Sequence, residues 1–129
     1  MATSSKPLRF RSALCLAAAG VALAAAGAAL AVPARAATVQ HVTVKMTEFR
    51  FRLSTSTVRT GTVVFTIVNR GQIPHDFSIQ KLQRVSALVQ PGHTTTMRVT
   101  FKRGGTYYYL CTVGAHVQYG MSGNLHVKR

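Results

Sequence analysis

The feature that most constrains this chain is a run of metal-binding side chains near its C-terminus, from Cys111 to Met121. The run holds a thiol at Cys111, an imidazole at His116 and a thioether at Met121, with four residues between successive members. A second imidazole, His75, lies 36 residues before Cys111. Thiolate, two imidazoles and a weak thioether are the ligands of a trigonal electron-transfer copper site. We therefore predict a fold that brings these four side chains together.

Cysteine usage favours a metal over a disulfide. The chain has two cysteines, and Cys111 is the one outside the N-terminal segment that holds Cys15. A lone thiol in an exported domain is open to oxidation unless something occupies it, and a bound metal would do so. The alternatives are an inert buried cysteine and an intermolecular disulfide, but the neighbouring His116 and Met121 favour the metal.

Residues 1–36 have the organisation of a secretory signal peptide. A basic start is followed by a charge-free run, rich in Ala and Leu, over residues 13–32. Small residues then flank Arg35, at the two positions that a signal peptidase reads. We expect cleavage after Ala36, which would leave residues 37–129 as one domain in the periplasm or outside the cell. A run of about 20 apolar residues is also long enough to stay as a membrane anchor.

The expected domain is strongly basic. Residues 37–129 hold twelve Lys and Arg against two acids, Glu48 and Asp76, for a formal net charge of +10. Nucleic-acid binding is disfavoured, because an exported protein seldom meets nucleic acid and neither a basic helix nor an RNP-type aromatic run is present. The charge favours partners with acidic docking faces, whose attraction weakens with salt, or association with an anionic membrane or wall. For most single basic residues a solvated position is the simpler interpretation.

The pattern of residues 37–129 predicts an all-β domain. Short segments alternate apolar and polar residues or are rich in β-branched and aromatic residues, as half-buried strands are. Gly and Pro turns separate these segments, and none of them shows a convincing helical period. We expect a β-sandwich of about seven or eight strands, near residues 39–46, 49–53, 63–68, 75–81, 85–89, 94–101, 106–111 and 124–127.

This arrangement of strands supports the metal hypothesis. Cys111 falls where a strand ends, and the loop that follows carries His116 and Met121. His75 begins a separate strand, directly after Pro74. A sandwich whose loops gather at one end can bring these four residues to one place.

The same segments resemble the cupredoxins, the small blue copper proteins. The resemblance runs through residues 37–129. Its most specific part is the ordered ligand set, whose last member, Met121, lies in a Gly-Met-x-Gly motif. It implies a small Greek-key β-sandwich and one copper ion that alternates between Cu(I) and Cu(II). The motifs that carry it are Phe49-Arg50-Phe51, Asn69-Arg70-Gly71, His75-Asp76-Phe77, Pro91-Gly92-His93, Gly105 to Cys111 and Gly120 to Leu125.

The resemblance also implies a role for each site residue. Cys111 would be the thiolate ligand, and His75 and His116 would be the imidazole ligands. Met121 would be the long axial ligand, which tunes the reduction potential. Electrons would leave through the partly exposed His116, surrounded by an apolar docking patch made of Val113, Ala115, Val117 and Tyr119.

Asp76 is a departure from the family pattern, which often has Asn or Ser after the first histidine ligand. The backbone N–H of Asp76 can still help to hold the thiolate. Its carboxylate, if ionised near the thiolate, would stabilise Cu(II) and lower the reduction potential. Asp76 is therefore expected just outside the ligand set.

Together these features favour an exported single-electron carrier that does no bond chemistry, and we expect a monomer. The alternative is a copper-handling protein that scavenges copper or delivers it to an oxidase with the same ligands. Methionine-rich or histidine-rich tracts would favour delivery, and residues 37–129 contain neither. An enzyme such as a multicopper oxidase or nitrite reductase is disfavoured, because such enzymes need additional domains or paired His-x-His ligands.

Overall fold

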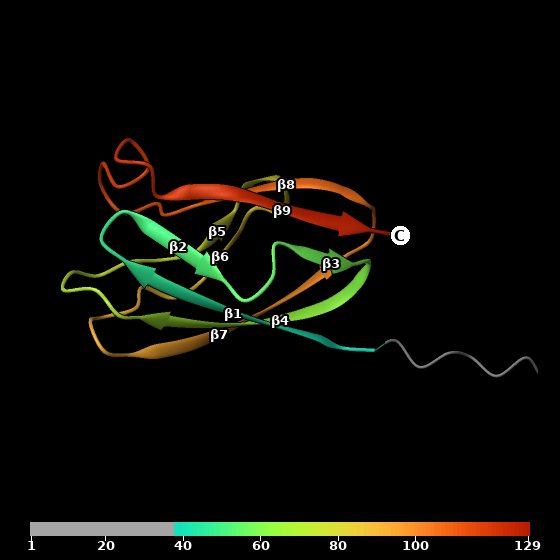
Figure 1. Ribbon diagram of the computed structural model, residues 1–129, viewed down its shortest axis with the longest axis horizontal. Coiled ribbons are helices and arrows are strands. Elements are labelled where there is room, and N and C mark those ends of the chain that lie inside the picture. Colours follow the sequence, from blue (N-terminus) through green and yellow to red (C-terminus); the bar gives the residue numbers. More distant parts are fainter. Residues whose placement is uncertain (1–37) are drawn as a thin grey trace, which may run out of the picture. The chain divides into compact units, whose positions relative to one another are not determined.

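A sandwich of two β-sheets makes up the part of the chain that the computed structural model describes, residues 38–129 (Figure 1). One sheet has the order β2-β1-β4-β7 and contains β1 (Gln40–Thr47), β2 (Arg50–Leu53), β4 (Gly61–Asn69) and β7 (Thr94–Phe101). The other has the order β3-β9-β8-β5-β6 and contains β3 (Thr57–Arg59), β9 (Ser122–Lys128), β8 (Gly105–Leu110), β5 (Ser78–Ile79) and β6 (Arg84–Val85). The expected small Greek-key β-sandwich is confirmed.

The chain crosses repeatedly between the two sheets. β1 pairs in parallel with β4, and β3 pairs in parallel with β9, while the remaining pairs are antiparallel. The short β5 and β6 join the second sheet before the chain returns to the first as β7. No helix that could cross a membrane occurs among residues 38–129. The expected signal segment, residues 1–36, lies outside the described residues.

Strict alternation in β4 explains the position of the core. Val63, Phe65 and Ile67 are fully buried, while the residues between them are partly exposed. Burying each of these side chains away from water stabilises the folded state by roughly 1.5–3 kcal/mol. Phe65 also lies within 5.4 Å of Phe77, ring centroid to ring centroid, so an aromatic contact links β4 to the second sheet.

The structure differs from the expected strands at three places. The segment expected to be extended over residues 75–81 is a strand only at β5, since a 3-10 turn, η1 (Gln80–Leu82), follows directly. The strand expected at 85–89 is reduced to β6 and an isolated bridge between Val89 and His75. β3 was not expected, because its one buried apolar residue, Val58, gives too short an alternation to show in the sequence.

The end of the sandwich that carries the loop between β8 and β9 also carries the turn between β1 and β2. Figure 1 shows both at the left, with residues 111–121 as the orange and red loop. β8 ends at Leu110, one residue before Cys111, and β1 ends at Thr47, one residue before Glu48. The fold therefore brings Glu48 and Phe49 to the end of the molecule that carries the expected ligands.

Candidate metal centre

Three of the four expected ligands converge in one cluster. The metal-binding atoms of His75, Cys111 and His116 all lie within 4.8 Å of one another. The Nδ1 atoms of the two histidines are 3.1 Å apart. Cys111 Sγ lies 3.9 Å from Nδ1 of His75 and 3.5 Å from Nδ1 of His116. Separations of this size are those of donors around a trigonal ion with bonds of roughly 2.0–2.3 Å, the lengths known for zinc.

Met121 lies directly beside this cluster. The N–H of Cys111 donates to the carbonyl of Met121 at 3.0 Å, and the N–H of Met121 donates to the carbonyl of His116 at 3.1 Å. Met121 is fully buried, as is Cys111. The loop that leaves β8 therefore folds back on its own start, and its last residue is adjacent to its first.

A series of tight turns fixes the loop between Cys111 and Met121. Backbone N–H groups donate three residues back, from His116 to Val113, from Gln118 to Ala115, from Tyr119 to His116 and from Gly120 to Val117. Gly120 has φ 95°, a backbone conformation that residues with a side chain rarely adopt. The turns orient His116 toward Cys111 while leaving part of its side chain exposed.

His75 is held from both sides of its backbone. Its N–H donates to the Val89 carbonyl at 3.2 Å, and its carbonyl accepts from the Val89 N–H at 2.8 Å. The residue is fully buried. Burial lowers the pKa of His75, and the nearby His116 lowers it further. His75 is therefore a neutral imidazole near pH 7, the form that binds metal ions.

Cys111 is in a similarly dry position. Burial raises the pKa of its thiol, while the backbone N–H groups of Asp76 and Val113 act in the opposite direction. A thiolate is the form that binds a metal, so binding at this position releases a proton.

The side chain of Asp76 fixes the residue after the cysteine. Asp76 is buried, and its carboxylate accepts hydrogen bonds from the Thr112 N–H at 2.6 Å and from the Thr112 hydroxyl. Together with its backbone N–H near Cys111, this gives Asp76 two contacts with the start of the metal-binding loop.

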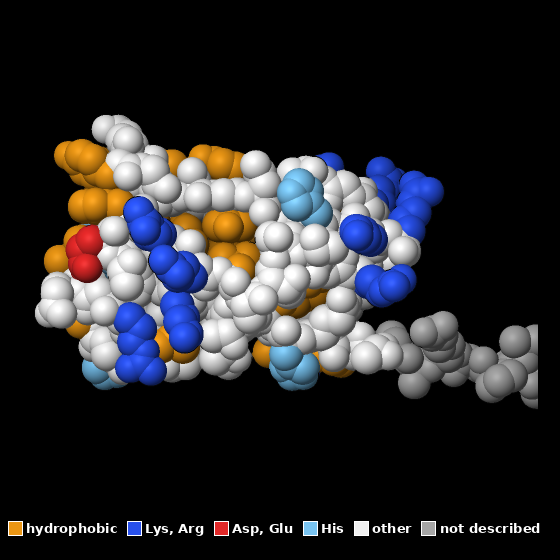
Figure 2. All heavy atoms as spheres, viewed as in Figure 1, with side chains coloured by type: hydrophobic (Ala, Val, Ile, Leu, Met, Phe, Trp, Pro, Cys, Tyr) orange, Lys and Arg blue, Asp and Glu red, His pale blue; other side chains and the backbone are white. Residues whose placement is uncertain are grey.

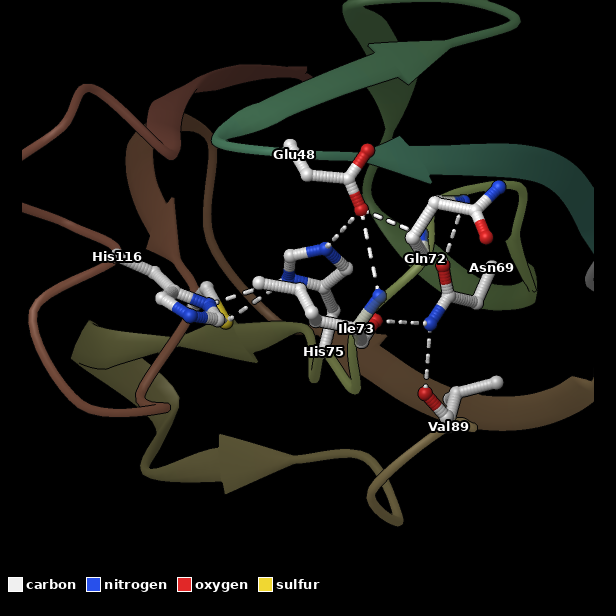
Figure 3. A network of polar contacts seen from close by, with 9 residues as sticks. Glu48, Asn69, Gln72, Ile73, His75, Val89 and His116 are labelled. Atoms are coloured by element: carbon white, nitrogen blue, oxygen red, sulfur yellow. Dashed lines mark hydrogen bonds and ion pairs between the residues drawn. The ribbon is translucent and has the colours of Figure 1, made fainter. Parts of the chain in front are cut away.

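Two residues of the turn between β1 and β2 reach the cluster although the sequence pattern does not predict it. Oε1 of Glu48 lies 3.8 Å from Nε2 of His75 (Figure 3). The ring of Phe49 lies 5.2 Å from the ring of His116, edge to face, and 4.7 Å from the ring of Tyr119. The one available signal for Glu48 was its rarity, since the chain contains just two acidic residues.

The residues expected to surround His116 lie on the loop with graded exposure. Tyr119 is 66% exposed, and Val113, Ala115 and Val117 are partly exposed. Figure 2 shows hydrophobic side chains gathered at the same end of the molecule, beside the red carboxylate atoms. The remaining histidines of the described residues, His41, His93 and His126, are exposed and outside the cluster.

Comparison with known proteins identifies the family. A family model described as a Cupredoxin-like domain matches residues 18–127. The chain belongs to the cupredoxin family. A search of curated proteins found no match. The cupredoxin fold, with His75, Cys111, His116 and Met121 arranged as a type 1 copper site, confirms copper as the expected cofactor.

Solved cupredoxin structures share this fold. Auracyanin from Roseiflexus castenholzii has a TM-score of 0.57 and 20% identity, over 71% of this chain and 98% of that chain. Auracyanin A from Chloroflexus aurantiacus has a TM-score of 0.57 and 17% identity, over 70% of this chain and 100% of that chain. A copper-containing nitrite reductase from Thermus scotoductus has a TM-score of 0.56 and 23% identity, but the match covers 28% of that chain. The two auracyanins are therefore similar to this domain over nearly their whole length, and the reductase over one part.

Proposed function

We propose that the chain is a single-electron carrier whose type 1 copper is held by His75, Cys111, His116 and Met121. The observation that carries this proposal is the convergence of one thiol and two imidazole nitrogens at separations of 3.1–3.9 Å. Copper bound there would gain and lose one electron between Cu(I) and Cu(II).

The surrounding chain is suited to electron transfer without bond chemistry. The side chains of His75, Cys111 and Met121 are buried, so water and substrates are kept from most of the site. The two sheets and the hydrogen-bonded loop between β8 and β9 hold the ligands. This limits the movement of the ligands when the metal changes charge. Electrons would leave through His116, which is partly exposed.

The docking patch of Val113, Ala115, Val117 and Tyr119 would bring a partner close to His116. An apolar patch with a partly exposed ligand at its centre favours brief contacts that exclude water. The basic surface would add attraction toward acidic redox partners or toward an anionic membrane or wall. Auracyanin A is described as a blue copper protein, and its similarity over its whole length supports a carrier rather than an enzyme.

The copper spectrum tests the proposal. The purified domain with Cu(II) should show an intense thiolate-to-copper band that Cys111→Ser abolishes and that His93→Gln, a change at an exposed histidine, leaves intact. Repeated reduction and reoxidation should restore the band without loss of copper. Absence of the band in the unmodified domain would contradict the copper site.

Copper delivery is the second candidate function, since the same ligands would serve it. It differs in the fate of Cu(I), which a delivery protein transfers to a competing acceptor. Retention of Cu(I) against a chelator through several redox cycles supports the carrier, whereas rapid transfer supports delivery.

Export of residues 37–129 is part of the proposal. The basic start, apolar run and small residues around Arg35 support a signal segment over residues 1–36. The intact mass of protein recovered outside the cytoplasm tests this, because cleavage after Ala36 gives a chain that begins at Ala37. A recovered chain that still begins at Met1 would favour a retained anchor.

A further inference from the structure

The second nitrogen of His75 faces a carboxylate. Nδ1 is directed to Cys111 and His116. Nε2 is buried and, among the described residues, has no hydrogen-bond partner. The acidic group near it is Oε1 of Glu48, 3.8 Å away (Figure 3). Histidines that bind metals almost always donate their other ring N–H to a carboxylate, a carbonyl or a water.

The carboxylate of Glu48 is held in place by the turn that precedes His75. Its Oε1 accepts hydrogen bonds from the backbone N–H of Gln72 and from that of Ile73. Gly71 makes this approach feasible, because a Cβ at that position would overlap Oε1 of Glu48. Both N–H groups donate to the same oxygen, the one that lies 3.8 Å from Nε2 of His75.

The turn itself is braced by a buried asparagine. Asn69 is fully buried, and its Nδ2 donates to the carbonyls of Ile73 and Val89, each at 2.8 Å. Its Oδ1 accepts the N–H of Gly71 at 2.8 Å. Val89 is the residue that pairs with the backbone of His75. One network therefore fixes both the histidine and the turn that holds Glu48.

We propose that Glu48 is a positioning residue for the copper site, acting on Nε2–H of His75. A proton kept on Nε2 leaves Nδ1 free as the metal-binding nitrogen, which is the tautomer that the proposed ligand set needs. A negative charge beside the imidazole makes the ring more basic and favours the higher charge of Cu(II) over that of Cu(I). The proposal rests on the proposed copper function.

This arrangement gives both acids of the chain a place at the copper site. Asp76 contacts Thr112, next to the cysteine ligand, and Glu48 lies beside the buried histidine ligand. The chain has sixteen basic residues and two acidic ones, yet within the described residues neither carboxylate pairs with a Lys or Arg side chain. Both acidic residues instead lie beside the proposed copper ligands.

Glu48→Gln is the sharpest test, because the amide keeps the shape and can still accept the N–H groups of Gln72 and Ile73. We expect the affinity for Cu(II) to fall about tenfold, at the lower end of the 10–100-fold range for such partners, and the affinity for Cu(I) to fall less. If the tenfold loss falls on Cu(II) alone, the reduction potential rises by about 59 mV. Glu48→Asp keeps the charge and should restore part of the Cu(II) affinity.

Arg50→Gln is the matched control, since it changes the net charge by one unit in the same hairpin. An effect of charge at a distance would give shifts of similar size and opposite sign in Glu48→Gln and Arg50→Gln. A positioning role gives a clearly larger shift in Glu48→Gln, and it also changes the NMR signal of the His75 Nε2 proton in the Cu(I) protein.

Two results would overturn the proposal. One is that Glu48→Gln and the unmodified protein have the same affinity for Cu(II), the same affinity for Cu(I), the same reduction potential and the same Nε2 proton signal. The other is that Glu48→Gln has lower thermal stability while its affinities for Cu(I) and Cu(II) change by the same factor. Both require an unmodified protein with the blue band, so failure here is distinct from failure of the proposed function.

Discussion

Phe49 has a backbone conformation that residues with a side chain rarely adopt. Its φ is 58°, in the left-handed region, where such a residue is less stable by roughly 1–2 kcal/mol. Its ring contacts the rings of His116 and Tyr119. The packing of the ring offsets the strain, so Phe49 connects the turn between β1 and β2 to the metal-binding loop.

This conflict predicts an unusual order of stability at position 49. Phe49→Ala should lower the free energy of unfolding by about 1–2 kcal/mol, less than the ~3–5 kcal/mol of a fully buried Phe. Phe49→Gly should be at least as stable as Phe49→Ala, because glycine relieves the strain. At Phe51, in β2, Phe51→Gly should be less stable than Phe51→Ala by about 0.5–1 kcal/mol. Urea unfolding of these four variants measures the free energies, and the same order of Ala and Gly at both positions would contradict the prediction.

His75 predicts how stability depends on pH in the copper-free protein. Burial lowers its pKa in the folded state, whereas the unfolded chain has a pKa of about 6.5. Below that value the unfolded state binds more protons, so the free energy of unfolding falls as the pH falls from 7 to 5. His75→Gln should flatten this slope. His126→Gln, at an exposed position, should leave it unchanged, and an equal slope in all three proteins would rule out His75 as its source.

The ligands and their partners differ in how far the sequence reveals them. Thiol, imidazole and thioether side chains are the ligands of type 1 copper, so their order and spacing along the chain already indicate a copper site. Glu48 and Phe49 carry no such chemistry. Their place near the site depends on the turn between β1 and β2 lying beside a loop more than 60 residues later. Contacts of that kind are set by tertiary packing, which a single sequence does not display.

At the scale of elements, alternation made the long strands predictable. In β1, β4, β7, β8 and β9 the buried residues recur at every second position, and in β2 the partly buried Phe51 and Leu53 do the same. β5 and β6 have two residues each and are held by pairing with their neighbours. Segments that short have no period to detect, so their strand character comes from the sheet rather than from local sequence.

The loop between β8 and β9 acts as one element because its turns depend on one another. Gly120 has φ 95° and open space around the position of a Cβ, so Gly120→Ala adds backbone strain of roughly 1–3 kcal/mol without a steric clash. The strain falls next to Met121, and we expect an altered visible spectrum and weaker copper binding.

Gly105→Ala provides the comparison for this loop. Gly105 has φ 141° and is equally free of contacts, but it begins β8, at the other end of the strand from Cys111. A similar loss of thermal stability is expected in both variants, with a changed copper spectrum in Gly120→Ala alone. Matching spectra in the two variants would show that the Gly120 turn does not control the site.

At the scale of the whole molecule, basic side chains lie at several places on the surface, while both acids lie at the end of the sandwich that carries the copper ligands. Figure 2 shows Lys and Arg side chains in two groups on one face. Lys45 and Arg52 are paired across β1 and β2 and exposed, within about three residues, or ~10 Å, of the turn that reaches the site. Lys102 and Arg103 lie beyond the other end of β8, and the strand from Gly105 to Cys111 alone spans roughly 20 Å at about 3.3 Å per residue.

Electron transfer to an anionic oxidant should distinguish these two pairs. The Debye length is about 30 Å at 0.01 M salt and about 10 Å at 0.1 M. With hexacyanoferrate(III) as the probe, both Lys45→Gln/Arg52→Gln and Lys102→Gln/Arg103→Gln should slow the reaction at 0.01 M. At 0.1 M the distant pair is screened from the copper end, so the Lys45 and Arg52 variant alone should remain slower than the unmodified protein. Equal rates for the two double variants at both salt concentrations would mean that net charge, and not its position near the copper, controls the encounter.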